Sequence, residues 1–194
     1  AYEIVDCDWS SDVCSSDLVY SLQYVGAPTI WSTQLLGDNI SIIGQNAVSQ
    51  ASNIVYWMGL DKFYKYDGRV QTLRCDLRQH VFSDINLAQG AQVCSGTNEG
   101  FNEVWWFYPS ANSTVNDKYV VYNYAEDTWY YGNLGRTAWL DTALRDYPQA
   151  ATYSYNIVEH ENGNDDNTTS TPTDRKSTRL NSSHSQQSRM PSSA

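Results

Sequence analysis

The 194-residue sequence has little positive charge, few cysteines and no long apolar run. It holds 12 Lys and Arg against 22 Asp and Glu, a formal net charge of −10. Such a balance argues against nucleic-acid binding through a basic patch, since phosphate neutralisation needs Lys and Arg. No apolar run approaches the length that spans a bilayer, so we expect no membrane partner. The C-x-x-C, G-x-S-x-G and Gly-rich phosphate-loop patterns are also missing, and we predict no metal, no cofactor and no catalytic residue.

Both ends of the chain resemble translated sequencing adapter. Residues 8–18 read as one strand of a short-read adapter and residues 174–194 as the other, in the expected opposite orientations; residues 1–4 fit the adapter sequence just upstream. Segments of this kind are set aside before a fold is considered. We therefore predict that residues 1–18 and 174–194 are adapter-derived and disordered. The natural stretch is then expected to be residues 19–173, truncated at both ends.

Setting these ends aside leaves the acidic character unchanged. They contain four of the 12 basic and six of the 22 acidic residues, so residues 19–173 retain eight basic and 16 acidic residues, a net charge of −8. Two of the four cysteines remain, Cys75 and Cys94. Two cysteines are not a disulfide framework, and we expect free, partly buried thiols.

Most of residues 19–161 reads as short strands separated by turn residues. Apolar or alternating runs rich in Tyr, Trp and Val stop at Gly, Pro or Asp-Gly, as strands do. We predict strands over residues 19–25, 53–58, 62–66, 69–73, 103–108, 119–124 and 128–131, with a two-residue hairpin turn at Asp67-Gly68. Residues 76–89 lack Gly and Pro and place Leu77, Val81 and Ile85 on one helical face, which predicts one or two short helices.

An internal repeat is the most informative feature of the sequence. Residues 53–58 (NIVYWM) align with residues 102–107 (NEVWWF), and residues 61–67 (DKFYKYD) align with residues 117–123 (DKYVVYN). A fainter third copy begins at Asn156, and the segment that starts at Val19 fits the end of an earlier copy. The period near fifty residues suits a β-propeller blade of four antiparallel strands.

The repeat decides the predicted architecture. We predict an all-β fold in which residues 19–161 form a fragment of a β-propeller, about three four-stranded blades, with a short helical insertion. Residues 162–173 are expected to be a polar loop or linker. An antiparallel β-sandwich is the alternative.

Seven aromatic residues of the stretch 53–139 are candidates for packing between blades or for a partner interface. They are Tyr56, Trp57, Trp105, Trp106, Tyr122, Trp129 and Trp139. Trp105 and Trp106 are adjacent in one strand, so they point to opposite faces of its sheet. We favour packing against neighbouring blades; stacking on a sugar or a partner is the alternative.

The titratable residues suggest no active site. His80 falls on the predicted helix and His160 near a strand end, and neither has a Ser or Cys partner in the sequence pattern. A propeller glycosidase needs two carboxylates that face a common pocket. Asp84, Glu103 and Asp141 are the candidates, but their spacing does not indicate that any two converge, and we predict a protein that is not an enzyme.

Four aromatic segments are similar to those of a known group of proteins. They are residues 56–59 (YWMG), 98–108 (NEGFNEVWWFY), 117–124 (DKYVVYNY) and 136–141 (RTAWLD). Together they resemble virion structural proteins of marine short-tailed bacteriophages, over most of residues 19–161, and these look related to the tail nozzle, or packaged-DNA stabilisation, class. Pro109 departs from the pattern, because a proline ends a strand or confines it to an edge.

The resemblance implies a function and a location. It implies a propeller repeated around the tail axis below the portal, which extends the DNA exit channel and helps to retain the genome. The implied partners are portal or other tail proteins, copies of the chain in a ring, and packaged DNA that passes nearby without sequence recognition. The protein would be made in the cytoplasm of the host bacterium and reside in the virion. A carbohydrate- or receptor-binding β module is the alternative function, and a propeller hydrolase is a third.

Overall fold

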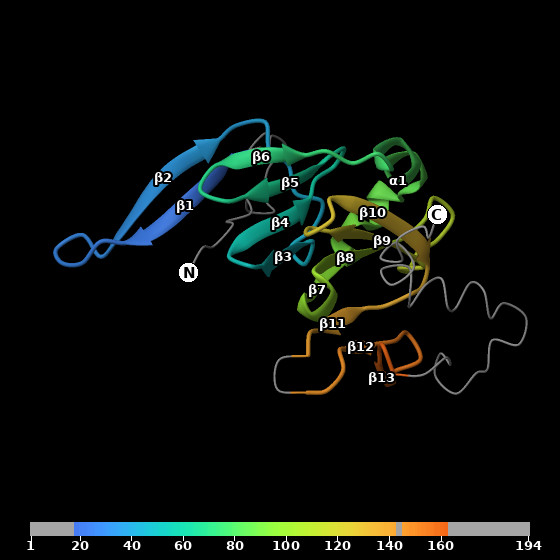
Figure 1. Ribbon diagram of the computed structural model, residues 1–194. Coiled ribbons are helices and arrows are strands. Elements are labelled where there is room, and N and C mark those ends of the chain that lie inside the picture. The colour runs from blue at the N-terminus through green and yellow to red at the C-terminus, as the bar shows by residue number, and fades with distance from the viewer. Residues whose placement is uncertain (1–17, 143–144, 163–194) are drawn as a thin grey trace, which may run out of the picture.

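The computed structural model describes residues 18–142 and 145–162 (Figure 1). These residues form thirteen β-strands, one α-helix and two 3-10 helices. The predicted all-β class is therefore confirmed. The adapter-like segments at residues 1–17 and 174–194, and all but the first residue of the predicted polar linker at residues 162–173, lie outside the described residues.

The strands form four antiparallel sheets that follow one another along the chain. The first is a hairpin of β1 (Val19–Tyr24) and β2 (Trp31–Gly37). Sheet I contains β3 (Val48–Ala51), β4 (Ile54–Met58), β5 (Phe63–Tyr66) and β6 (Val70–Leu73). Sheet II contains β7 (Cys94–Asn98), β8 (Glu103–Tyr108), β9 (Lys118–Asn123) and β10 (Thr128–Asn133). Sheet III contains β11 (Ala138–Leu140), β12 (Gln149–Ala151) and β13 (Ile157–Glu159).

The sheets stack face to face in chain order, with an apolar cluster between each pair. Val19 of the hairpin packs with Trp57 and Tyr64 of sheet I. The other face of sheet I packs on sheet II through the largest cluster, and the far face of sheet II packs on sheet III. Three interfaces in series exceed the single interface of a two-layer sandwich. The described strands form an open stack, and they do not close into a ring.

Aligned residues of the internal repeat point toward corresponding neighbouring sheets. Trp57 of sheet I and the aligned Trp106 of sheet II both point toward the preceding sheet, whereas Tyr56 and the aligned Trp105 both point toward the following sheet. This alternation is the period-2 geometry of a strand that is buried on both faces. All six residues of β8 are buried, as its continuous apolar run predicts.

The repeated asparagine that precedes each of these strands has a conformational reason. Asn53 has a φ of 63° and Asn102 a φ of 60°, which is the left-handed region. Asparagine enters this region more easily than other residues with a side chain. Each asparagine therefore ends the turn from the first strand of its sheet into the second.

The first strands of successive sheets lie side by side, in the order β3, β7, β11 (Figure 1). The backbone N–H of Ser95 donates to the carbonyl oxygen of Asn46 at 2.8 Å, and the hydroxyls of Ser49 and Ser95 are 3.0 Å apart. The indole N–H of Trp139 donates to the carbonyl oxygen of Thr97 at 2.6 Å. A propeller also gathers its first strands in this way, around its axis.

The helical insertion occurs where it is predicted, between sheets I and II. Helix α1 (Arg78–Asp84) is followed by the 3-10 helix η1 (Leu87–Gln92), and a second 3-10 helix, η2 (Glu99–Phe101), joins β7 to β8. Val81 is fully buried and Ile85 nearly so, and both belong with Leu77 to the cluster between the two sheets. The apolar spacing i, i+4, i+8 thus identified the buried face of the insertion.

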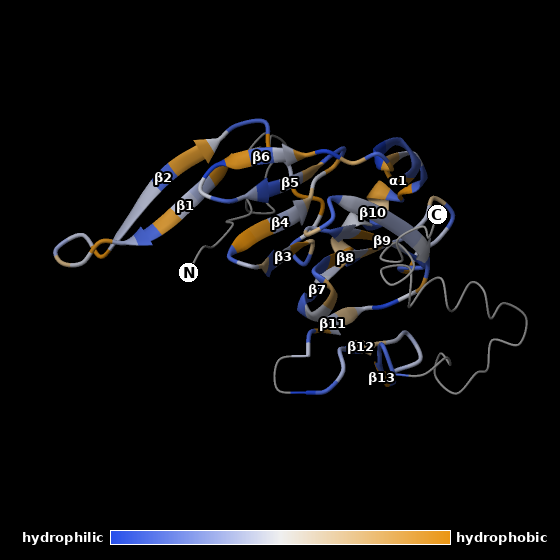
Figure 2. Ribbon diagram, in the orientation of Figure 1, coloured by the Kyte–Doolittle hydropathy of each residue, from blue (hydrophilic) through white to orange (hydrophobic). Residues whose placement is uncertain are grey.

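Two details of the sequence prediction were wrong. The turn between β5 and β6 has three residues, 67–69, because Tyr66 pairs with Val70. The segment at Asn156 leads into β13, the third strand of its sheet, rather than into a second strand such as β4 or β8. Within the described residues, sheet III has three strands. Strands β2, β3, β7, β11 and β12 were not predicted, and most of them are short and poor in large apolar residues (Figure 2).

Candidate functional site: the interfaces between stacked sheets

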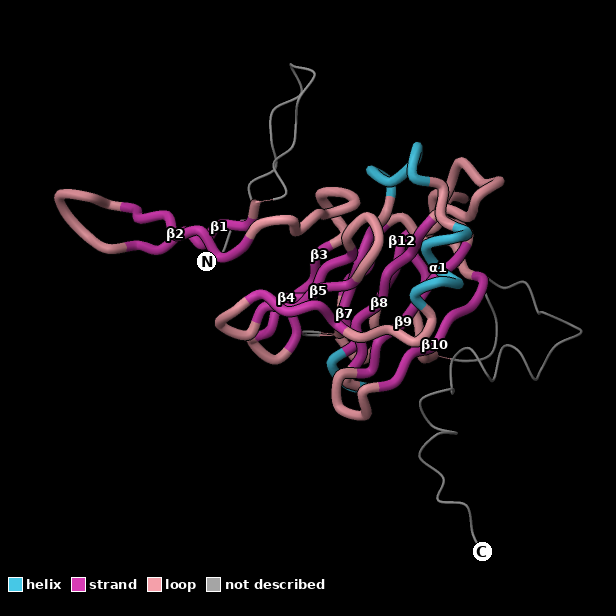
Figure 3. The backbone as a smooth tube through the Cα atoms, turned by 90° about the horizontal axis from the view of Figure 1, so that it is seen from above, coloured by secondary structure: helices cyan, strands magenta, loops and turns pink. Residues whose placement is uncertain are grey.

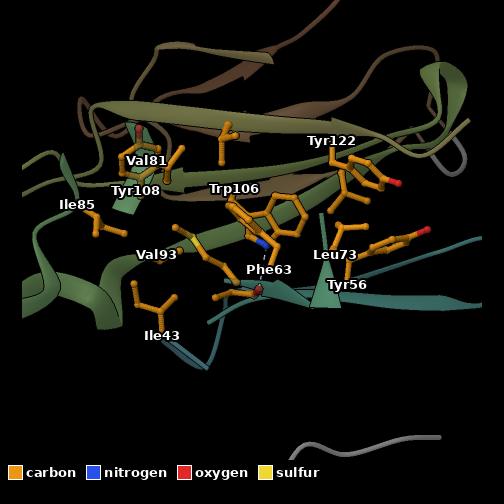
Figure 4. Packing of buried hydrophobic residues seen from close by; sticks show 14 of the residues in the cluster. Ile43, Tyr56, Phe63, Leu73, Val81, Ile85, Val93, Trp106, Tyr108 and Tyr122 are labelled. Carbon is orange, nitrogen blue, oxygen red and sulfur yellow. Dashed lines mark hydrogen bonds between the residues drawn. The ribbon is translucent and has the colours of Figure 1, made fainter. Parts of the chain in front are cut away.

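Trp106 lies at the centre of the interface between sheets I and II (Figure 4). Its ring centroid is 5.0 Å from that of Phe63 on sheet I. Its indole N–H donates to the carbonyl oxygen of Ala47 at 3.0 Å, across the interface. A buried indole usually finds such a partner, since an unpaired N–H would be costly away from water. Trp106 therefore joins the two sheets by packing and by a directional bond.

Tyrosines extend this interface toward its edge. The Tyr122 ring is 5.9 Å from the Tyr56 ring and 4.7 Å from the Trp129 ring, and its hydroxyl donates to Asp127 Oδ1 at 2.8 Å. Burial raises the pKa of Tyr56 to about 12. Burial, and then the bond to Asp127, also raise the pKa of Tyr122. Both phenols therefore stay neutral at any physiological pH and act as apolar bodies with one polar tip.

Trp139 fills the interface between sheets II and III. Its ring stacks on Trp105 with centroids 5.3 Å apart and planes 15° apart. Gly96 on β7 makes room for it, because an added Cβ there would stand 2.2 Å from Trp139 Cδ1. Glu103 is buried and accepts the indole N–H of Trp105 at 3.1 Å. The close packing of sheets II and III thus depends on a glycine at position 96 and on the stacked indoles of Trp105 and Trp139.

The structure places all the predicted aromatic residues between sheets. Tyr56, Trp57, Trp105, Trp106 and Tyr122 are at most 5% exposed, and Trp129 and Trp139 are partly buried against the same clusters. A sugar or a partner would need an exposed ring face to stack on. The arrangement favours the packing role for these residues.

The three candidate carboxylates serve separate structural contacts. Asp84 on α1 pairs with Lys118 Nζ at 2.7 Å, with both side chains less than a third exposed. Glu103 holds an indole, as described above, and Asp141 accepts from the hydroxyl of Thr97 at 3.1 Å. Asp84 and Asp141 thus tie the elements that carry them to neighbouring strands, whereas the contact of Glu103 lies within β8.

Both histidines also make structural contacts. The His80 ring lies 4.5 Å from the ring of Tyr131, which ties α1 to β10. His160 Nε2 accepts from Arg136 Nε at 2.9 Å, and its ring lies 4.6 Å from that of Trp139. Arg136 is only 4% exposed, so this charge is held inside the protein beside sheet III.

Asn116 is an important residue that the sequence did not reveal. It is 1% exposed, and its amide donates to the carbonyl oxygens of Gln92 at 2.8 Å and of Arg136 at 3.0 Å. It therefore connects the end of η1 to the segment before β11. A polar loop residue has no periodic signal, and its partners lie 24 and 20 positions away.

The two predicted free thiols are confirmed at Cys75 and Cys94. Burial raises the pKa of both to about 12. A thiol with so high a pKa is a poor nucleophile near neutral pH. The structure thus gives these residues an apolar packing role.

Among residues 18–142 and 145–162, no group of three or more His, Cys, Asp or Glu side chains is placed to hold a metal ion. The helix in this part of the chain is too short and polar to cross a membrane. No protein-family model matches the chain, and no curated protein matches it significantly.

Proposed function

We propose that this chain is part of a non-enzymatic virion structural protein in the tail or neck of a short-tailed bacteriophage. One observation carries the proposal: the candidate aromatic side chains pack between the stacked sheets, and the candidate acidic and histidine side chains make structural contacts within the stack. The stack supports a scaffold, because sheets I and II present the same aligned positions to their neighbours. The resemblance of the aromatic segments to virion proteins supplies the biological setting.

The edge formed by β3, β7 and β11 supports a place beside a DNA channel. These three strands contain no charged residue. DNA binds tightly where Lys and Arg neutralise its phosphates. DNA that passed along an uncharged edge of an acidic protein would therefore slide without being held.

The proposed partners and location follow from this role. The chain would contact portal or other tail proteins and further copies of itself in a ring. Packaged DNA would pass nearby without sequence recognition. The protein would be made in the cytoplasm of the host bacterium and would end in the virion.

Two measurements test the proposal. Trimming the adapter-like sequence and reassembling the locus should give a longer reading frame with further copies of the N-x-V-x-W pattern, beside portal and capsid genes. Mass spectrometry of gradient-purified virions should then detect peptides of residues 19–162 in a fixed ratio to the portal protein. A frame that closes near residues 19 and 173, a metabolic neighbourhood, or virions free of these peptides would refute it.

A carbohydrate- or receptor-binding module is the second candidate, and one observation favours it. Tyr24 is 65% exposed and Trp31 51% exposed on the hairpin, with their rings edge to face at 5.5 Å. Exposed aromatic pairs of this kind suit stacking on a sugar ring. Glycan binding by the purified chain that is lost on Trp31→Ala would support this candidate, and its absence over a broad glycan panel would remove it.

A further inference from the structure

An Asp-Gly pair builds the turn between β5 and β6. Asp67, Gly68 and Arg69 form this turn, and all three are exposed. Gly68 has a φ of 115°, which residues with a side chain rarely adopt. An added Cβ at Gly68 would meet no atom within 4 Å. The conformation of the turn therefore favours glycine at this position, and the space beside it is open.

The turn lies where the sheet restrains it least. It is at the end of sheet I away from α1 (Figure 1), and Figure 3 shows loops protruding at that end of the sheet. β6 is an outer strand of sheet I, hydrogen-bonded to β5. Exposed turns with few packed neighbours open locally at almost no free-energy cost. The surrounding strands therefore leave the backbone of the turn free to change conformation.

The Asp67 carboxylate is weakly held. Among the described residues, Gln71 alone donates hydrogen bonds to it, from Nε2 to Oδ1 and to Oδ2, both at 3.0 Å and at the protein surface. Asp117 is a useful contrast, because the N–H and the hydroxyl of Ser110 donate to its two oxygens, each at 2.7 Å. An exposed bond to one flexible amide contributes little. The Asp67 carboxyl group can therefore turn toward its own backbone more easily than that of Asp117.

The backbone nitrogen of Gly68 is the group that the carboxyl carbon would meet. Within the described part of the chain, the Gly68 N–H donates no hydrogen bond. Glycine also lacks the Cβ that would hinder a close approach to its nitrogen. Asp67 is the one aspartate of the sequence that a glycine follows. An accessible nitrogen and a mobile carboxyl group thus adjoin at this position.

We propose that Asp67-Gly68 is a site of spontaneous isoaspartate formation in the folded protein. The Gly68 nitrogen forms a bond to Asp67 Cγ, and its proton leaves with the carboxyl hydroxyl as one molecule of water, which gives a five-membered succinimide. Water then opens the ring. Opening at the side-chain carbonyl restores aspartate, whereas opening at the main-chain carbonyl leaves isoaspartate, whose backbone runs through Cβ and Cγ. Water is the only co-reactant, and no group is oxidised or reduced.

The modification would alter the end of β6. Isoaspartate adds one carbon to the backbone of a turn that the pair Tyr66–Val70 closes. Val70 packs against the cluster that contains Trp57 and Tyr64. We therefore expect the first residues of β6 to loosen as the protein ages. This inference goes beyond the proposed structural role and does not depend on it.

Ageing of the full 194-residue chain at neutral pH and physiological temperature tests the site. Peptide mapping with electron-transfer fragmentation distinguishes isoaspartyl from aspartyl peptides of equal mass, and isoaspartate should accumulate at Asp67. Because an open turn is not protected, its rate should lie within about ten-fold of the rate in the same chain unfolded in guanidinium. Asp117 should show none in the folded chain. Asn162-Gly163 is a separate candidate pair in the sequence, so the modification must be assigned peptide by peptide.

Variants of the turn identify the chemistry. Asp67→Glu would need a six-membered ring, which forms more slowly, so its peptide should stay unmodified. Asp67→Asn expels ammonia in place of water and should react faster. Gln71→Ala frees the carboxyl group and should accelerate the reaction several-fold. Gln50→Ala, at an exposed glutamine on β3, is the matched control and should react like the wild type. Far-ultraviolet circular dichroism confirms that each variant is folded.

Three outcomes overturn the proposal. The first is a folded chain that reacts at Asp67 more than about ten-fold slower than the unfolded chain, because the turn would then protect the pair. The second is an equal isoaspartate signal in Asp67→Glu, which would place the reaction elsewhere. The third is a Gln71→Ala variant that reacts no faster than Gln50→Ala, because the carboxylate would then not be what limits the reaction. None of these results depends on whether the peptides occur in virions.

Discussion

The space left by Gly96 gives a sharp test of how sheets II and III fit together. An added Cβ at this position would stand 2.2 Å from Cδ1, 2.4 Å from Cγ and 2.6 Å from Cβ of Trp139. Trp139 has little freedom to move, because its ring stacks on Trp105 and its N–H donates to Thr97. Gly96→Ala should therefore lower the free energy of unfolding by about 1–3 kcal/mol, the usual cost of overfilling a packed interior.

Gly100 is the matched control for this substitution. A Cβ added at Gly100 would meet no atom closer than Asn98 Oδ1 at 3.7 Å, which is ordinary contact. Gly100→Ala should then be neutral or stabilising by about 0.4–1 kcal/mol, because alanine restricts the unfolded chain. Of these two Gly→Ala substitutions, four residues apart, only the one at Gly96 is thus expected to destabilise the chain.

A second substitution identifies the clash as the cause. Trp139→Gly removes all three atoms that the new Cβ would strike, so Gly96→Ala should cost almost nothing in that background. The coupling energy should be roughly 1–3 kcal/mol in a double-mutant cycle from urea unfolding. If Gly96→Ala cost the same with and without Trp139, or if Gly100→Ala were equally destabilising, the close packing of these two sheets would be refuted.

Three further predictions concern other buried groups. Trp106→Phe removes the N–H that Ala47 accepts and should cost roughly 1–3 kcal/mol in urea unfolding; an unchanged midpoint would contradict the bridging role. Burial raises the pKa of the Cys75 and Cys94 thiols to about 12. Both thiols should therefore resist iodoacetamide at about pH 8 until the chain unfolds. Rapid labelling of the folded protein, measured by peptide mapping, would count against this. Burial also raises the pKa of Glu161 from 4.5 to about 7, so the folded state binds this proton more tightly and stability from this group is lost as pH rises between these values. Glu161→Gln should therefore stabilise the chain relative to wild type at about pH 8 but not at about pH 4, and a pH-independent difference would disprove the assignment.

The sequence predicted best those elements that are buried on both faces. β8 and β4 are continuous runs of large apolar residues because neighbouring sheets cover both of their faces. The adjacency of Trp105 and Trp106 was enough to assign them to opposite interfaces. Val81 identified the buried face of α1 by its spacing. In each case the local pattern and the tertiary environment favour the same structure.

The first strands of the sheets could not be predicted, and the structure gives the reason. β3, β7 and β11 lie side by side. β3 and β7 carry mostly small or polar residues that resemble turn sequence, and β11 has only three residues. Gly96 is the clearest case, since it lowers strand propensity in order to admit Trp139. Their strand conformation depends on pairing and packing rather than on intrinsic preference.

Buried polar groups were missed for a related reason. Asn116 and Arg136 bond to groups more than twenty positions away or to the backbone, and no local pattern marks such partners. A single sequence therefore reveals which faces are apolar but not which polar residues lie between them. The placement of Asp84, Glu103 and Asp141 in three unrelated contacts was equally invisible in their spacing.

Burial along the stack links the fold to assembly. Sheet II, which has a neighbour on each side, buries every residue of β8, whereas β1 and β13 at the two ends leave most of their residues partly or fully exposed. In a repeat protein each unit is stabilised mainly by its neighbours, so stability should fall from sheet II toward both ends. The ends are then the places where a further repeat or a second copy contributes most to stability. The apolar residues exposed at each end of the stack are stabilised when another sheet covers them. A sheet of the same repeat presents the kind of face that does so within the chain.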